Sequence, residues 1–187
     1  MIAAALLACA ANVAPITLQA VIEVESGGNP LAIHVNGIEA QPVASDVAQA
    51  VQLAESYIVR GYSVDLGLMQ VNSRNLSALG ITVVQAFDPC RNISAGATIL
   101  SADYANASRS RGPGQGALQA ALSAYNTGDF YRGFANGYVA RYYGRSAFAP
   151  TAMGSRVPRP AASAVPNPFT ASTSIYSRMK LDARIVG

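Results

Sequence analysis

The chain has 187 residues, of which 51% are apolar and only 12% are charged, with a net charge of +3. This composition is typical of one compact globular domain and excludes an intrinsically disordered chain. The small positive charge favours anionic partners, such as a cell-wall polymer or a membrane surface. No basic run interleaved with aromatic residues marks a nucleic-acid groove, and a single histidine, His34, argues against a zinc site built on several histidines.

The first ten residues, MIAAALLACA, are small and apolar, like the hydrophobic stretch of a signal peptide, although no positively charged segment precedes them. We expect residues 1–11 to be a signal-peptide remnant or an N-terminal segment. Leu7-Ala8-Cys9 has a weak similarity to a lipoprotein processing site. A disulfide between Cys9 and Cys90 would close a loop of about 80 residues and would imply an oxidising compartment such as the periplasm. Two buried thiols are the alternative, and no apolar run elsewhere reaches the roughly 20 residues of a membrane span.

Apolar side chains recur with a helical period from Asn12 to Ser26, and Gly27-Gly28 then favours the end of a helix. Glu25 lies on this apolar stripe in the last turn. Burial and the negative end of the helix dipole both raise the pKa of a carboxyl there, as a general acid requires. Glu23 is two residues away and points elsewhere. The alternative is that Glu25 only caps a neighbouring loop.

The dipeptide Asn36-Gly37 predicts a β-hairpin with strands near Ala32–Val35 and Ile38–Gln41. A second helix follows, with Ser45 or Asp46 as its N-cap. Its expected apolar stripe consists of Val47, Val51, Ala54 and Ile58, and its expected end is Gly61. The short run Tyr62–Val64 is a candidate third strand.

The run DLGLMQVN, residues 65–72, places several polar side chains in a short stretch. Gly67 interrupts apolar residues, so we expect the backbone to turn there or to be approached closely. The amides of Gln70 and Asn72 suit hydrogen bonds to a sugar. The alternative is an ordinary loop that leads into a short helix, Ser73–Leu79.

Further helices are expected at Thr82–Phe87 and from Asn92 to about Asn106, followed by a loop over 108–116. Another helix carries an apolar stripe that ends at the polar run Asn126-Thr127-Gly128. A last short helix or turn is expected to carry Tyr138, Tyr142 and Tyr143. We therefore expect one folded domain over residues 12–145 and a Pro/Ala/Ser-rich, disordered tail over 146–187.

Four separate motifs occur in one order along the chain. They are Glu25-Ser26 with Asn29-Pro30, Gly67-Leu68-Met69-Gln70, Asn92-Ile93 with Gly96, and Ala124-Tyr125-Asn126-Thr127-Gly128. With this order the chain resembles the lytic transglycosylases that have a goose-lysozyme-like fold. It is similar in finer detail to the VirB1-like proteins of type IV secretion systems, over residues 9–144.

This resemblance implies a mainly α (α+β) fold, with a lysozyme-like helical domain and a small β-hairpin or sheet wing flanking an active-site cleft. It implies cleavage of the β-1,4 bond between N-acetylmuramic acid and N-acetylglucosamine in peptidoglycan, leaving a 1,6-anhydro end. It also implies a periplasmic location and type IV secretion components as partners, with no metal, no cofactor and no nucleic acid.

Residue by residue, Glu25 matches the family's catalytic glutamate. Gln70, Tyr125 and Asn126 match residues that hold the saccharide and orient the acid. Met69 is expected to pack beneath the site, and Tyr138 to be the late tyrosine near the acid. Two carboxylates are needed by an ordinary glycosidase, whereas one suffices when the sugar's own C6 hydroxyl attacks.

Asp65 departs from the small-residue lead-in of the broader family and is the one candidate for a second carboxylate. If it faced Glu25, a muramidase that uses water would become the competing function; a hydrogen bond that braces its loop is the simpler alternative. A third possibility is a peptidoglycan-binding assembly module without catalysis.

Overall fold

The computed structural model describes residues 2–143 of the chain. Their contacts divide them into two compact units, residues 2–99 and residues 100–143, and helix α6 (Pro89–Arg111) runs from the first into the second. The expected tail over 146–187 lies outside the described residues.

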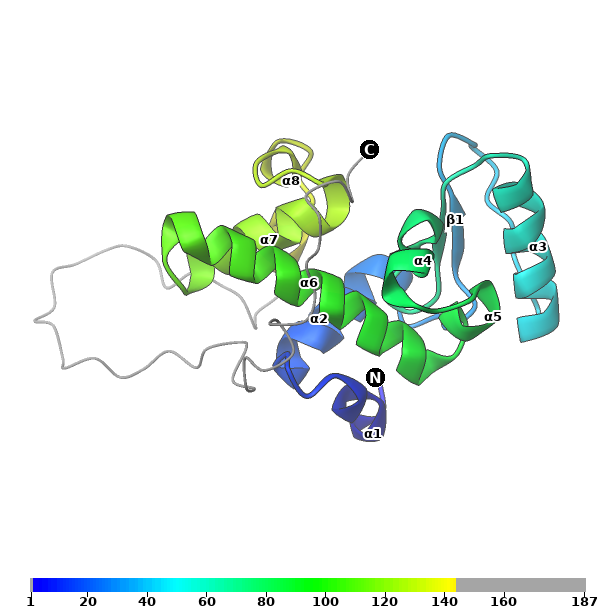
Figure 1. Cartoon of the computed structure of the whole chain (residues 1–187), viewed down its shortest axis with the longest axis horizontal. Coiled ribbons are helices and arrows are strands. Elements are labelled where there is room, and N and C mark those ends of the chain that lie inside the picture. Colours follow the sequence, from blue (N-terminus) through cyan, green and yellow to red (C-terminus); the bar gives the residue numbers. More distant parts are fainter. Residues whose placement is uncertain (1, 144–187) are drawn as a thin grey trace, which may run out of the picture. The chain divides into compact units, whose positions relative to one another are not determined.

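The first unit combines helices with one small sheet (Figure 1). Its helices are α1 (Ala4–Leu7), the 3-10 turn η1 (Ala8–Ala10), α2 (Pro15–Ser26), α3 (Val47–Val59), the 3-10 turn η2 (Ser73–Asn75), α4 (Leu76–Leu79), α5 (Val83–Ala86) and the beginning of α6. Its strands are β1 (Ile33–Val35), β2 (Val64–Leu66) and β3 (Val71–Asn72). This mainly helical architecture with a small antiparallel sheet confirms the predicted fold class.

The three strands pair antiparallel in the order β1-β2-β3. The predicted hairpin around Asn36-Gly37 is wrong, because β1 pairs with β2, about 30 residues further along, with Ile33 opposite Leu66. Gln41 explains the difference: its side chain accepts from Val35 N at 2.6 Å, so a side chain rather than a second strand holds the chain there. The central strand β2 begins at Val64, the last residue of the expected third strand Tyr62–Val64, so that prediction is only partly right.

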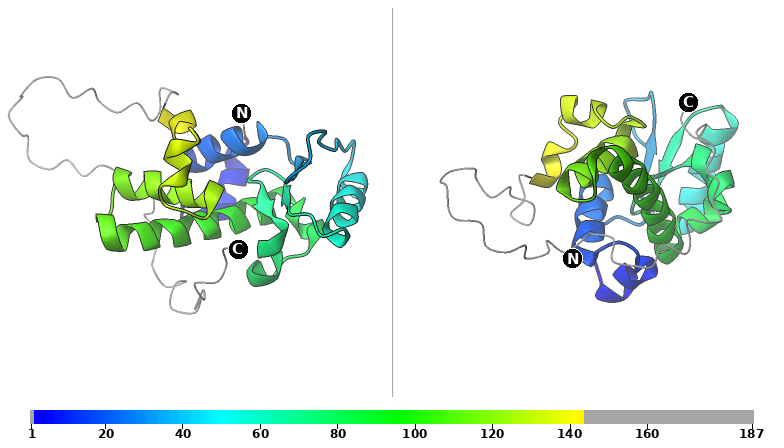
Figure 2. Two further views of the ribbon diagram at one scale, coloured as in Figure 1. Left: turned by 90° about the horizontal axis from the view of Figure 1, so that it is seen from above. Right: turned by 60° about the vertical axis from the view of Figure 1, so that its left-hand side comes forward.

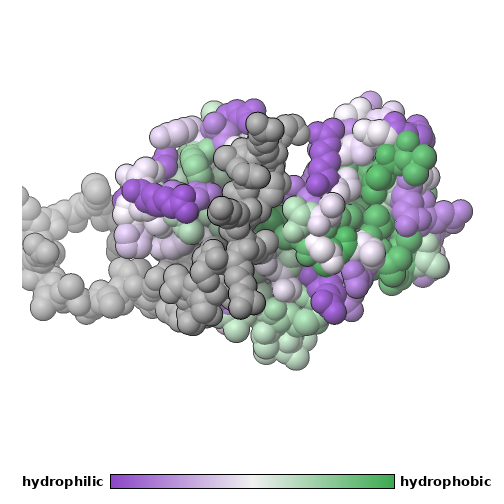
Figure 3. Space-filling model, viewed as in Figure 1, coloured by the Kyte–Doolittle hydropathy of each residue, from purple (hydrophilic) through white to green (hydrophobic). Residues whose placement is uncertain are grey.

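Helix α3 begins after Asp46, whose side chain accepts from Gln49 N, as predicted. Its expected apolar stripe is only partly right, because the fully buried positions are Ala50 and Ala54, whereas Val47 is 47% exposed. Two small alanines let α3 pack closely on β1 and β2. The exposed valines of α3 contribute to the apolar surface seen over α3 and α5 in Figure 3.

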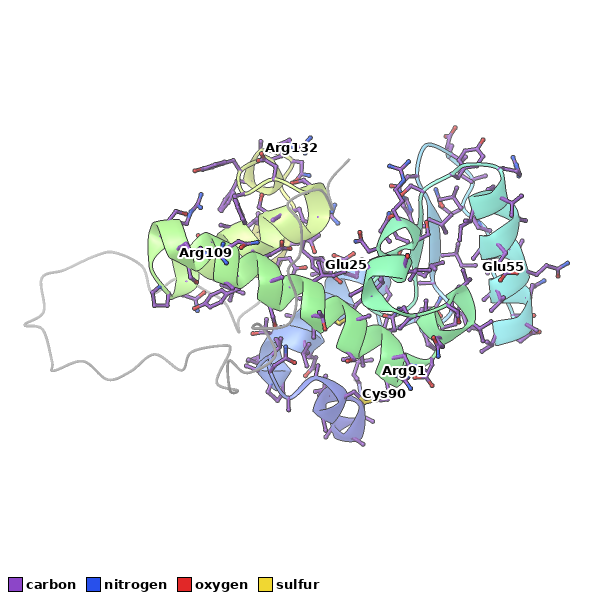
Figure 4. All side chains as sticks on the ribbon, in the orientation of Figure 1. Glu25, Glu55, Cys90, Arg91, Arg109 and Arg132 are labelled. Atoms are coloured by element: carbon purple, nitrogen blue, oxygen red, sulfur yellow. A yellow bond between two sulfur atoms is a disulfide. The ribbon has the colours of Figure 1, made fainter. Side chains whose placement is uncertain are left out.

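The N-terminal segment is joined covalently to the start of α6. Cys9 and Cys90 form a disulfide with a Cα–Cα distance of 5.4 Å, which decides between the two alternatives for these cysteines (Figure 4). No single helix within residues 2–143 is long and apolar enough to cross a membrane, although α1 with η1 and α2 together pass on length and composition as a pair bent by 102°.

Helix α6 begins at Pro89 rather than at the expected Asn92. Proline is well suited to a first helical turn because its missing N–H has no partner there. Asp88 Oδ1 accepts from Arg91 N at 2.8 Å and caps the turn. The helix also continues to Arg111, into the expected loop, and Gly112 follows with a φ of +72°.

The second unit contains the rest of α6, α7 (Gln115–Thr127), α8 (Arg132–Ala135) and α9 (Ala140–Tyr143). The end of α6 and α7 lie side by side in both views of Figure 2, and Gly114 N donates to Tyr104 Oη across their turn at 3.0 Å. Helix α8 packs on α7. Tyr142 and Tyr143 lie on the last short helix, as predicted, and Tyr138 precedes it.

Candidate active site

Glu25 lies half-buried in the last turn of α2, where the sequence predicts it (Figure 4). The helix ends because Gly27 adopts the left-handed conformation, with a φ of +61°. The neighbouring Ser26 accepts from Gly28 N and donates to Leu68 O at 2.8 Å, so its hydroxyl bonds backbone at the helix end. This long-range bond ties the end of α2 to the loop that follows β2.

That loop, residues 67–70, is shaped by Asn92. The buried Asn92 side chain accepts from Met69 N at 2.7 Å and donates to the carbonyls of Leu66 and Ala86. Gly67 has a φ of +73°, and a Cβ at this position would lie 2.5 Å from Asn92 Nδ2. The expected turn and close approach at Gly67 are both confirmed, and the approaching group is a side chain of α6.

Met69 and Gln70 occupy different environments in this loop. Met69 is completely buried, whereas Gln70 is partly exposed and has a φ of +47°, which is unusual for a residue other than glycine. The Gln70 amide donates to Gly67 O at 3.0 Å and to Ala32 O at 3.3 Å. The nitrogen of Gln70 therefore binds backbone of its own loop and of the segment before β1, and its Oε1 accepts from none of residues 2–143.

Asp65, on the central strand, is held by two asparagine amides. Its Oδ2 accepts from Asn36 Nδ2 at 2.9 Å and its Oδ1 accepts from Asn72 Nδ2 at 2.6 Å. Burial raises the pKa of Asp65, and the two amides oppose that rise because they stabilise the ionised form. Asp65 thus makes the bracing bonds that the sequence suggested as its simpler role.

In the second unit, Asn136 connects two of the predicted site residues. Its Nδ2 donates to Asn126 Oδ1 at 3.1 Å, and its Oδ1 accepts from the backbone N–H of Tyr138 at 2.9 Å. Tyr138 is buried and shares a hydrogen bond of 2.5 Å with the hydroxyl of the fully buried Tyr142. Tyr125 is partly exposed at the end of α7. The binding roles of Tyr125, Asn126 and Tyr138 remain predictions.

Asp103 on α6 is a further acid whose burial the sequence did not predict. Burial alone raises its pKa to about 7, because no hydrogen bond or ion pair from residues 2–143 offsets the loss of solvent. Its only sequence signal was an acid beside the buried Ser101 and Tyr104 on a helix of mixed polarity. Asn36 and Asn136 were also missed, and each gave no more signal than a polar residue beside a glycine.

Among the described residues, no three His, Cys, Asp or Glu side chains are grouped so that they could hold a metal ion. What the first unit offers is a carboxyl at a helix end, Glu25, and an amide-bound carboxylate, Asp65. A carboxyl in the setting of Glu25 is suited to proton transfer.

The chain is similar to proteins of one family. A model of the transglycosylase SLT domain matches residues 3–148. The chain is 45% identical over 133 residues to protein virB1 of Agrobacterium fabrum, covering 71% of this chain and 54% of that protein. It is 46% identical over 129 residues to type IV secretion system protein virB1 of Brucella abortus biovar 1, covering 67% and 53%. It thus spans about half the length of the curated relatives it matches, and no solved structure matches it closely enough to support a comparison.

Proposed function

Since this chain belongs to the transglycosylase SLT family, we propose that it is a peptidoglycan lytic transglycosylase. Its substrate is the β-1,4 bond between N-acetylmuramic acid and N-acetylglucosamine, and its product carries a 1,6-anhydro end. The observation that carries the proposal is the setting of Glu25, a half-buried carboxyl in the last turn of α2. The Ser26–Leu68 bond fixes this turn against the loop of residues 67–70.

The proposed reaction needs one acid that changes its protonation state twice. Glu25 donates its proton to the glycosidic oxygen while the C1–O bond breaks and its electron pair passes to that oxygen. The C6 hydroxyl oxygen of the same muramic acid then bonds to C1, and its proton returns to Glu25. No water is consumed, and the enzyme ends in its starting state.

Substrate binding is proposed for the residues that the family resemblance selects. In the first unit these are Gln70, whose Oε1 accepts from no described residue, and Met69, which is buried beneath the loop surface. In the second unit they are Tyr125, Asn126 and Tyr138.

The biological setting is proposed from the relatives. Because two similar proteins are named for virB1, one of them as a type IV secretion system protein, we assign this chain to wall opening during assembly of such a system. The Cys9–Cys90 disulfide fits an oxidising compartment, here the periplasm.

The test is to incubate purified protein with peptidoglycan and weigh the released muropeptides. Products lighter by one water than hydrolytic products support the proposal, whereas free reducing ends would make the protein a muramidase. The Glu25→Gln variant should lose about 10²–10⁴-fold in rate. Glu55→Gln removes an equivalent charge from the exposed face of α3 and should leave the rate unchanged (Figure 4). Equal rates for wild type and Glu25→Gln would contradict the role of Glu25, and no products from the wild type would leave a binding module.

A further inference from the structure

The second unit exposes two aromatic side chains at α8. Tyr131, the residue before the helix, is 69% exposed, and Phe134 within it is 46% exposed. The two residues are three positions apart, and Phe134 N donates to Tyr131 O at 3.1 Å, so one helical turn places both on the same side of α8. Neighbouring exposed rings are typical of a surface that binds a ligand or a partner.

Arg111, the last residue of α6, stacks on this surface. Its guanidinium carbon lies 4.8 Å from the centre of the Tyr131 ring and 5.7 Å from that of Phe130. Within residues 2–143, Arg111 forms no ion pair and its side chain donates no hydrogen bond, so its N–H groups are available to an anion. We call Arg111, Phe130, Tyr131 and Phe134 the aromatic–arginine patch.

The backbone that carries the patch is fixed. Asp129 Oδ1 accepts from Tyr131 N at 2.8 Å and from Arg132 N at 2.9 Å. Gly133 packs directly against Ser123, and its N–H donates to Ser123 Oγ. The rings therefore project from an ordered turn, and little backbone freedom would be lost when a ligand binds there.

The helix that carries the patch also contacts the end of α7, where the proposed saccharide-binding residue Asn126 lies. Arg132, labelled in Figure 4, donates to Thr127 O at 2.6 Å, and Asn136 Nδ2 donates to Asn126 Oδ1 at 3.1 Å. Arg132 and Asn136 are four residues apart and so lie on one side of α8. A polymer bound at Asn126 therefore lies beside the helix that exposes the patch.

The charge around the patch is opposite to that of the first unit. Residues 100–143 contain four arginines and two acids, a net charge of +2, whereas residues 2–99 contain three arginines and seven acids, a net charge of −4. A basic surface with exposed rings complements a ligand that has both carboxylates and apolar faces. Peptidoglycan is such a ligand, because its sugar rings expose C–H faces and its stem peptides carry carboxylates.

We propose that the aromatic–arginine patch is a second peptidoglycan-binding site, separate from the residues that cleave the glycan. Its rings stack on a sugar of the strand, and Arg111 binds a carboxylate of a stem peptide. Stacking removes apolar faces from water, and a guanidinium matches a carboxylate with two parallel N–H···O bonds. This inference rests on the proposed function for the identity of its ligand.

The test measures binding of the full chain to insoluble peptidoglycan by sedimentation. Glu25→Gln is the background, so that the polymer is not cut during the measurement. We expect Tyr131→Ala to raise Kd about tenfold and Arg111→Gln to raise it about fivefold. On peptidoglycan whose stem peptides have been removed by an amidase, Arg111→Gln should bind as the background protein does, because the carboxylates are gone.

The first unit supplies a matched control. Arg60 stacks on the half-buried Tyr57 and Tyr62 at 4.9 and 5.2 Å, so Arg60→Gln removes the same charge from a similar cluster whose rings are less exposed. We expect its Kd to equal that of the background. A similar rise in Kd for Arg60→Gln and Arg111→Gln would show unspecific attraction of charge and would overturn the inference.

Three other outcomes are decisive. Kd values within about twofold of the background for folded Tyr131→Ala and Arg111→Gln would overturn the inference, and Arg111→Gln decides alone if Tyr131→Ala fails to fold. Sedimentation with vesicles of phosphatidylglycerol and phosphatidylcholine, but not with peptidoglycan, would assign the patch to a membrane and overturn it as well. Wild-type protein that binds peptidoglycan through the patch and leaves it uncut would overturn the proposed function and support the binding site.

Discussion

Each of the two units contains a loop that is organised around one buried polar side chain with a glycine against it. In the first unit the side chain is Asn92 and the glycine is Gly67. In the second unit Ser123 donates to Asp129 O at 2.6 Å and accepts from Gly133 N at 2.8 Å, and a Cβ on Gly133 would lie 2.6 Å from the Ser123 backbone.

The difference between these loops is the reach of their bonds along the chain. Besides its bond to Ala86, 6 positions away, Asn92 bonds to residues 23 and 26 positions away, whereas Ser123 bonds only to residues 6 and 10 positions away. The loop that adjoins Glu25 therefore takes its shape only when distant segments have come together. The loop after α7 is a local structure. Its conformation should depend less on the rest of the molecule.

The largest effect is expected from removing the two organising side chains. Asn92→Ala leaves three buried backbone groups without their partner, and we expect a loss of about 4 kcal/mol in the free energy of unfolding. Ser123→Ala leaves only Gly133 N without its partner, because Asp129 O also accepts from Thr127 Oγ1, and we expect about 2 kcal/mol. Chemical denaturation of both variants measures the two losses. Equal losses would contradict the comparison.

A smaller effect is expected from the glycines. Gly67→Ala places a Cβ against both Asn92 and the Ala86 carbonyl in a left-handed conformation, so we expect a loss of about 3 kcal/mol. Gly133→Ala meets the same crowding without a positive φ, and we expect about 2 kcal/mol. Thermal unfolding measures both. Gly80→Ala is the control for a left-handed glycine in open space and should lose only about 1 kcal/mol.

The two units also differ in the hydrogen bonding of a buried acid, and stability measured over a series of pH values can detect the difference. Asp65 has two amide donors, whereas the pKa of Asp103 rises from 3.8 to about 7 through burial alone. Folded Asp103 then binds a proton that the unfolded chain has lost, so stability should fall as pH rises from about 4 to about 7. The pKa shift corresponds to a loss of at most about 4 kcal/mol in the free energy of unfolding. Because Asp103 is partly exposed, we expect a loss of roughly 2 kcal/mol.

Asp103→Asn isolates this contribution. The variant should gain stability over wild type at pH 8 and match it at pH 4, as measured by chemical denaturation at both values. A constant difference between the two proteins across this range would show that Asp103 is not buried as a neutral acid.

The smallest expected loss of stability follows from removing the side-chain hydroxyls at the ends of α2 and α7. Ser26 bonds across 42 residues to Leu68, whereas Thr127 bonds to Ser123 and Asp129 nearby. Ser26→Ala and Thr127→Ala should each cost about 1 kcal/mol. Only Ser26→Ala should also lower the rate of peptidoglycan cleavage, because it loosens the turn that carries Glu25. A similar fall in rate for both variants would contradict this distinction.

Signals from neighbouring residues in the sequence correctly predicted the features that short-range hydrogen bonds determine. The end of α2 at Gly27 and the cap of α3 at Asp46 were read correctly from neighbouring residues. The strand that pairs with β1 was predicted wrongly. Asn36-Gly37 is compatible with a turn in several contexts, and strand pairing depends on which side chains reach the core. The roles of Asn92 and Asn136 were hidden for the same reason, since an amide gives no sequence signal of the backbone groups it meets.

The disulfide has a consequence for the fate of a damaged molecule. It closes a covalent ring from Cys9 to Cys90, and every element from α2 to α5 lies within that ring. A protease that cuts one peptide bond between these cysteines opens the ring but releases no fragment. Glu25 and the loop of residues 67–70 would stay attached to the same molecule after such a cut, so a nicked protein outside the cytoplasm could retain its active site until the disulfide is reduced.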